Sequence, residues 1–226
     1  MKKYLLLCLM LVSVTAAFAE KDPRDYKVIA YRADGSQFEG YVTTALRRYF
    51  RPKVSEVGIS EVYGGEPRTY TSDEVKSIVF PPTEKDTVTV VYEAVTAMLK
   101  ANMFSKMKPT KSPVFMRLIY NGKNVKGYVM PFVDQTLTTT PDAYLNTMTY
   151  TYQYFFMPVS EGMAKGYWMD VQGVMPNAKG FIKKFLKDFP EIGEMLDKGE
   201  LTAKEFRENP AIVLPMMDEI LEKRKH

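Results

Sequence analysis

The sequence predicts an α+β protein in which a mainly antiparallel β portion precedes a C-terminal helical segment. Three observations support this fold class. Apolar and β-branched residues recur with period two through most of residues 26–174, which is typical of strands. Two turn signals, Asp34-Gly35 and Asn121-Gly122, interrupt this portion and favour hairpins. After Pro176 the apolar period changes to about 3.6, which indicates helices.

A small antiparallel β unit is expected over residues 20–80. Five strands are expected in it, over residues 26–33, 36–44, 54–63, 68–71 and 74–80. Pro81-Pro82 then prevents further pairing, because proline donates no hydrogen bond to a neighbouring strand. The unit is therefore predicted to be a meander of short strands.

A second β-rich unit is expected over residues 87–176, and the sequence leaves open whether it shares a domain with the first. Its expected strands cover residues 87–96, 114–120, 125–133, 144–157 and 166–174. Residues 94–107 also suit a short helix, so both alternatives stay open there. Residues 131–141 are polar and rich in threonine, and they are predicted to form a loop.

The C-terminal helices are expected over residues 177–226, with the first apolar face spanning residues 181–189. Residues that commonly start, end or bend a helix mark the boundaries: Asn177 as a first N-cap, Pro190 in the first turn of a second helix, Gly199 at its end, Thr202 and Glu205 as a capping box, and Pro215 as a kink in the last helix. Three or four helices are therefore predicted to pack on the sheet.

Residues 1–19 have the pattern of a secretory signal peptide. Lys2 and Lys3 precede an apolar run from Tyr4 to Val14, and Ala17-Phe18-Ala19 resembles a cleavage site. The run is shorter than the about twenty residues that a membrane-spanning helix needs. The protein is therefore predicted to be periplasmic or secreted, with no membrane span after cleavage.

The composition of the exported part excludes several chemistries. The single cysteine, Cys8, lies in the leader, and the single histidine is His226. Disulfides, zinc sites of cysteine and histidine, cysteine nucleophiles and Ser-His-Asp triads are therefore not expected. Loss of Lys2 and Lys3 lowers the formal charge from +4 to +2, which does not favour a polyanion. No cofactor, metal or nucleic-acid partner is expected.

Two groups of residues are candidates for ligand binding. The aromatic group lies in the densest aromatic region and comprises Tyr150, Tyr152, Tyr154 and Trp168. It could stack on sugar rings, although packing between a sheet and helices is the favoured interpretation. The basic group, Arg47, Arg48 and Arg51, could bind phosphate or carboxylate groups on lipid or cell-wall polymers. A solvated loop is the favoured alternative for these arginines.

Catalytic motifs are weak in this chain. Glycosidase chemistry needs two facing carboxyl groups, and Asp134 and Asp170 are the pair best placed near strand ends. Residues 105–108 match Ser-x-x-Lys, the nucleophile motif of penicillin-binding enzymes, but the companion Lys-Thr-Gly is absent. A chance match is the favoured interpretation of this motif.

Two stretches resemble an uncharacterised family of secreted or periplasmic proteins of Bacteroidota. Residues 40–80, GYVTTALRRYF…ISEVYGGEPRTYTSDEVKSIVF, resemble its hairpin unit with the closing segment Tyr70–Ile78. Residues 181–206, FIKKFLKDFPEIGEMLDKGELTAKEF, resemble its C-terminal helices, with Phe189 in place of a cysteine. The resemblance implies this architecture and an exported location, and it supplies no catalytic residues.

The sequence therefore favours an exported envelope or secreted protein that binds a partner, an envelope protein or a glycan, without catalytic activity. The alternative is a carboxylate-dependent hydrolase that acts on glycans or cell-wall material. Two carboxyl groups about 5–10 Å apart in a cleft would favour the hydrolase. An exposed aromatic face without such a pair would favour binding.

Overall fold

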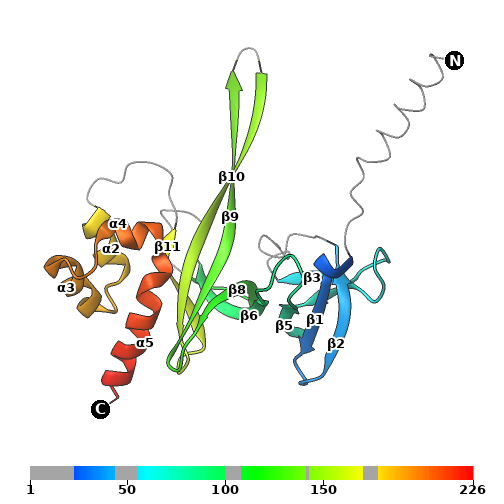
Figure 1. Ribbon diagram of the computed structural model, residues 1–226, viewed down its shortest axis with the longest axis horizontal. Coiled ribbons are helices and arrows are strands. Elements are labelled where there is room, and N and C mark those ends of the chain that lie inside the picture. The colour runs from blue at the N-terminus through cyan, green and yellow to red at the C-terminus, as the bar shows by residue number, and fades with distance from the viewer. Residues whose placement is uncertain (1–22, 44–54, 100–107, 141–142, 170–177, 226) are drawn as a thin grey trace.

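The computed structural model describes residues 23–43, 55–99, 108–140, 143–169 and 178–225, with the backbone alone for 99, 132–140 and 143–151. An 11-stranded, mainly antiparallel sheet precedes four α-helices, so the predicted α+β class is confirmed. The helices and the N-terminal strands lie on opposite sides of the central strands, and a long hairpin projects between them (Figure 1).

The N-terminal strands follow a short 3₁₀ turn, η1 (Pro23–Asp25). The first four form the expected meander, whereas the fifth returns beside the first. The five strands are β1 (Lys27–Arg32), β2 (Gln37–Val42), β3 (Glu56–Ser60), β4 (Arg68–Thr71) and β5 (Val75–Phe80), in the spatial order β5-β1-β2-β3-β4. Gly35 has a φ of +85°, so the predicted Asp34-Gly35 hairpin turn is confirmed. Val28, Ile78 and Phe80 are fully buried at the centre of this unit.

The second group of strands forms a closed ring. It comprises β6 (Val90–Leu99), β8 (Val114–Asn121), β9 (Val125–Thr140), β10 (Ala143–Pro158) and β11 (Met163–Met169), while the short β7 (Lys108–Pro109) pairs beside β6. Residues 163–165 of β11 pair in parallel with residues 96–98 of β6, which closes the ring. Ala97, Met116, Tyr128, Phe155 and Ala164 come from all five strands and form the buried interior.

Strand β6 belongs to both groups. Its first half pairs with β5, placing Ile78 opposite Tyr92, and its second half pairs with β8 and β11. Tyr92 packs in the N-terminal core, whereas Val95 and Ala97 pack inside the ring. The strand alternative for residues 94–99 is therefore the one observed.

Strands β9 and β10 form the long hairpin, with paired residues from Val125 opposite Pro158 to Thr140 opposite Ala143. Strand β8 flanks only residues 126–129 of β9, and β11 flanks only residues 153–156 of β10. The loop predicted for residues 131–141 is wrong, because residues 131–140 continue β9. Threonine favours extended backbone, and the register with β10 holds these polar residues in a strand.

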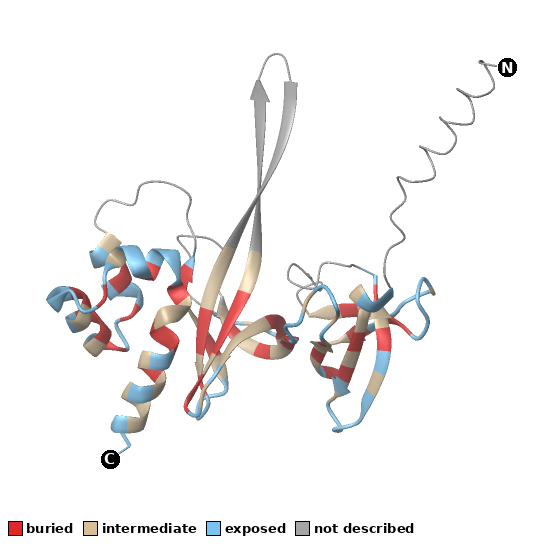
Figure 2. Ribbon diagram, viewed as in Figure 1, coloured by how far each residue is buried: buried red, intermediate tan, exposed pale blue. Residues whose placement is uncertain are grey.

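The helices cover one side of the ring. They are α2 (Ala178–Phe185), α3 (Pro190–Lys198), α4 (Ala203–Glu208) and α5 (Val213–Lys223), with the 3₁₀ turn η2 (Pro210–Ile212) before α5. Figure 2 shows their buried residues on the faces that meet other elements. Phe156 and Tyr167 of the ring pack with Ile182 and Leu214 of the helices. No helix in the described ranges is long and apolar enough to cross a membrane.

Several helices begin or end at the residues that the sequence predicted. Pro190 opens α3, and Gly199 ends it with a φ of +78°. Thr202 and Glu205 form the predicted capping box at the start of α4. The kink predicted at Pro215 is wrong, since this residue lies in the first turn of α5, where a missing N–H costs nothing. Asn177 lies outside the described residues.

Candidate functional site

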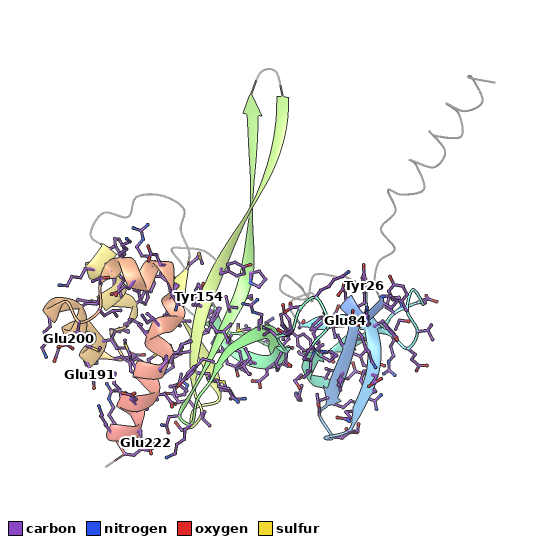
Figure 3. The ribbon with its side chains drawn as sticks, in the orientation of Figure 1. Tyr26, Glu84, Tyr154, Glu191, Glu200 and Glu222 are labelled. Atoms are coloured by element: carbon purple, nitrogen blue, oxygen red, sulfur yellow. The ribbon has the colours of Figure 1, made fainter. Side chains whose placement is uncertain are left out.

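Trp168 and Tyr154 lie where the helices pack on the ring. Trp168 is 4% exposed, and its ring lies edge-on to Phe206 and Phe185 at 5.0 and 6.2 Å between centroids. Tyr154 is half-buried against the same cluster, 6.3 Å from the ring of Tyr167 (Figure 3). Both positions agree with the packing interpretation of the aromatic group.

Tyr152 and Tyr150 lie farther out along β10. Tyr152 is half-buried and faces Pro131 in the register, and Tyr150 faces Val133. Alternate residues of a strand share a face, so Tyr150, Tyr152 and Tyr154 form one row that leads away from the helical cluster. The row therefore starts in the core and continues onto the projecting hairpin.

The other sequence candidates are not brought together. Arg47, Arg48 and Arg51 lie outside the described residues, as do Ser105–Lys108 and Asp170. Asp134 lies in β9 opposite Thr149 of β10. Of the two carboxylates considered for a hydrolase, Asp134 therefore lies in a strand of the hairpin, and Asp170 lies outside the described residues.

A polar cluster occupies one end of the ring interior. The Glu93 carboxylate accepts hydrogen bonds from Lys126 Nζ at 2.9 and 3.0 Å and from Tyr128 Oη at 2.5 Å. Burial, followed by the hydrogen bond to Glu93, raises the pKa of Tyr128 far above its usual range. The phenol therefore keeps its proton and acts as a donor, and the cluster links β6 to β9 across β8.

A second polar cluster fastens the turn between β8 and β9 to α5. Asp218 Oδ1 accepts the backbone N–H groups of Asn124 at 2.6 Å and Val125 at 2.8 Å. The Asn124 side chain donates to the Asp218 carbonyl at 3.1 Å and to Glu222 at 3.0 Å, and Lys123 also binds Glu222. These hydrogen bonds, Lys123 first, lower the pKa of Glu222 to about 2.

Side chains of α5 approach the backbone so closely at this junction that two positions favour glycine. A Cβ on Gly122 would lie 2.7 Å from Asp218 Oδ1, and one on Gly127 would lie 2.3 Å from Leu214 Cδ1. A hairpin turn follows Asn121 as the sequence predicted, but the Gly122 N–H donates to the Val125 carbonyl at 2.9 Å, so Lys123 and Asn124 form the turn. The contact of Gly122 with α5 explains the glycine. The base of the long hairpin is therefore held by both the ring and the last helix.

No sequence signal pointed to either polar cluster. Glu93 lies 33 residues from Lys126, and Asn124 lies 94 residues from Asp218. No short motif spans such separations, and only the strand order brings these groups together. Within the described ranges, no group of three or more histidine, cysteine, aspartate or glutamate side chains could hold a metal ion.

Comparison with known proteins assigns no relative to this chain. No family model matches it, and no curated protein or solved structure matches it.

Proposed function

We propose that this chain is an exported, non-catalytic binding protein that contacts a polypeptide partner through the outer part of the β9–β10 hairpin. This part, called the arm below, comprises residues 131–140 of β9 and 143–152 of β10. The observation that carries the proposal is that neither strand of the arm has a further neighbour among the described strands. The exported location rests on the leader at residues 1–19.

The base of the arm supports a binding role. An isolated two-stranded hairpin is marginally stable in water, so a long one needs support at its base or from a partner. Here Tyr128 and Phe155 are fully buried inside the ring, and Asp218 fastens the adjoining turn. The anchored base presents the arm, whose two edges have no further neighbour among the described strands.

The composition of the arm indicates the chemistry of the partner. No lysine or arginine occurs between Lys126 and Lys165, and the arm itself contains one charged residue, Asp134. Recognition therefore relies on backbone hydrogen bonds and on contacts with uncharged residues. A polypeptide offers both, because an extended segment can add a strand to an exposed sheet edge.

The alternative hydrolase has less support. The carboxylates described above, those of Glu93, Asp218 and Glu222, are bound to lysine, tyrosine, asparagine or backbone donors. Each one thereby joins two parts of the fold. A catalytic pair would need one carboxyl group to give or take a proton beside the substrate.

Site-specific photocrosslinking tests the proposal. A photoreactive phenylalanine analogue at Tyr150 is expected to give an adduct of discrete mass with an envelope polypeptide. The same analogue at Tyr31, which is 36% exposed on β1, serves as the matched control and is expected to give none. Equal adducts from both positions, or none from Tyr150, would contradict the proposal. Binding on a glycan array without a polypeptide adduct would instead favour the glycan alternative.

A further inference from the structure

We propose that the free edge of β10 in the arm pairs with the same edge of a second copy of this chain, giving a symmetric antiparallel dimer. The inference rests on the proposed binding role of the arm and names its partner. Two copies would then form a continuous sheet in the order β9-β10-β10-β9. A four-stranded sheet is more stable than two separate two-stranded hairpins.

The two edges of the arm differ in how they resist pairing. The β9 edge contains Pro131 and Asp134, and proteins use proline and charged residues to prevent unwanted strand addition. Strand β10 contains neither proline nor a charged residue from Ala143 to Met157. Beyond Gln153, no strand in the described part of the chain lies beside it on that edge. The β10 edge is therefore the one suited to accept a strand.

The absence of charge favours a second copy over another partner. Self-pairing brings identical strands together, so any net charge on the strand would repel its own copy. The uncharged run from Ala143 to Met157 avoids this repulsion. Threonine and tyrosine also favour extended backbone, and both recur throughout this run.

The residue pattern of β10 suits a two-fold axis at Thr149. A symmetric contact between identical strands must be antiparallel, and directly opposed residues share a face of the sheet. With this axis the opposed pairs are Thr149 with its copy, Met148 with Tyr150, Thr147 with Thr151 and Asn146 with Tyr152. Threonines oppose threonines on one face, and methionine or asparagine opposes tyrosine on the second face. Cross-strand threonine pairs stabilise sheets.

The mass of the chain in solution tests the dimer, measured by sedimentation over a range of concentrations on the chain from Glu20 onward. We expect a dimer that dissociates on dilution. The variant T147K/T149K places two charges on the β10 edge and is expected to weaken the dimer at least about tenfold. The control T136K/T138K adds the same charges to β9 on the same face of the hairpin and is expected to remain dimeric. Unchanged Trp168 fluorescence will show that each variant is folded.

Disulfide formation tests the axis. The chain from Glu20 onward contains no cysteine, so T149C introduces the sole thiol. Opposed residues of antiparallel strands have Cα atoms about 4.5–5.5 Å apart, which suits a disulfide. We expect oxidation to link two T149C chains, whereas the control D134C, on the register partner in β9, is expected to stay unlinked.

The outcomes separate this inference from the proposed function. A monomeric wild-type chain, or equal dissociation by both lysine variants, would overturn the dimer. If that chain still crosslinks from Tyr150 to a different polypeptide, the binding role of the arm stands and only the identity of the partner is wrong. If it is monomeric and yields no adduct, both proposals fail.

Discussion

The Asp218 carboxylate connects α5 to the base of the hairpin, and its removal has a calculable effect. Replacement by alanine deprives the Asn124 and Val125 N–H groups of an acceptor that lies 2.6 and 2.8 Å away. A hydrogen bond to a charged group contributes about 1.5–3 kcal/mol, and the half-buried site places each bond near the low end. We expect Asp218→Ala to lower the free energy of unfolding by about 2–4 kcal/mol.

Two further variants show whether the loss of stability comes from the Asp218 carboxylate itself. Asp218→Asn keeps a side-chain carbonyl as acceptor but loses the charge, and neutral hydrogen bonds are roughly half as strong. Its expected cost is therefore about 1–2 kcal/mol. Glu219→Ala changes an exposed residue at the next position of the same helix and is expected to alter stability by no more than about 0.5 kcal/mol.

Denaturant unfolding followed by Trp168 fluorescence measures these differences. Trp168 is the single tryptophan and lies buried against Phe185 and Phe206, so its emission reports the helical core directly. The midpoint should fall while the denaturant slope stays constant. If Asp218→Ala costs no more than Glu219→Ala, the assigned role of this carboxylate is wrong.

Three other measurements test the junction between the ring and the C-terminal helices. Gly127→Ala should cost about 1–3 kcal/mol because its Cβ meets Leu214, and Leu214→Ala in the same chain should recover part of that cost in a double-mutant cycle. Phe206→Ala should cost about 3–5 kcal/mol and shift Trp168 emission to the red, and an unshifted spectrum would contradict this packing. The pKa of Glu222 is about 2 in the fold against an ordinary 4.5, so its stabilising effect should be present above pH 4.5 and disappear as the pH falls toward 2. Acid titration of Glu222→Gln should lack that part of the decline.

Local sequence signals predicted the elements whose cause is local. The Asp34-Gly35 turn, the Gly199 helix end and the Thr202–Glu205 capping box each depend on a few neighbouring residues, and the structure contains all three. The last helix begins after a 3₁₀ turn, so Pro215 falls in its first turn and does not bend it. The apolar periodicity of residues 212–221 does not show where the first turn of this helix lies.

The parts that sequence analysis missed depend on distant residues. Closure of the ring pairs Ala164 with Ala97, and no local pattern indicates a parallel contact across that separation. The β9 half of the arm was missed for another reason, whereas the β10 strand was expected over residues 144–157. Alternation reveals a strand because one face is buried, whereas residues 131–140 carry polar residues on both register faces. Their extended conformation follows from pairing with β10.

Distant parts of the chain also decide which of the candidate aromatic residues are buried in the helical core. Trp168 and Tyr154 pack against helices that follow them in the chain. The residues next to them in the sequence therefore do not predict their burial. Tyr150 and Tyr152 continue the row onto the arm, where the binding role is now proposed. The Glu93–Lys126–Tyr128 cluster joins β6 to β9 across β8, and it became recognisable only with the strand order known.

The strand shared by the two cores has a consequence for how the molecule comes apart. Tyr92 and Ala97 lie on one uninterrupted strand, each embedded in a different hydrophobic interior. If either half of β6 lost its strand conformation, the other half would lose support, and the core that it lines would be exposed to water. The N-terminal meander and the ring are therefore expected to melt together, as one cooperative unit.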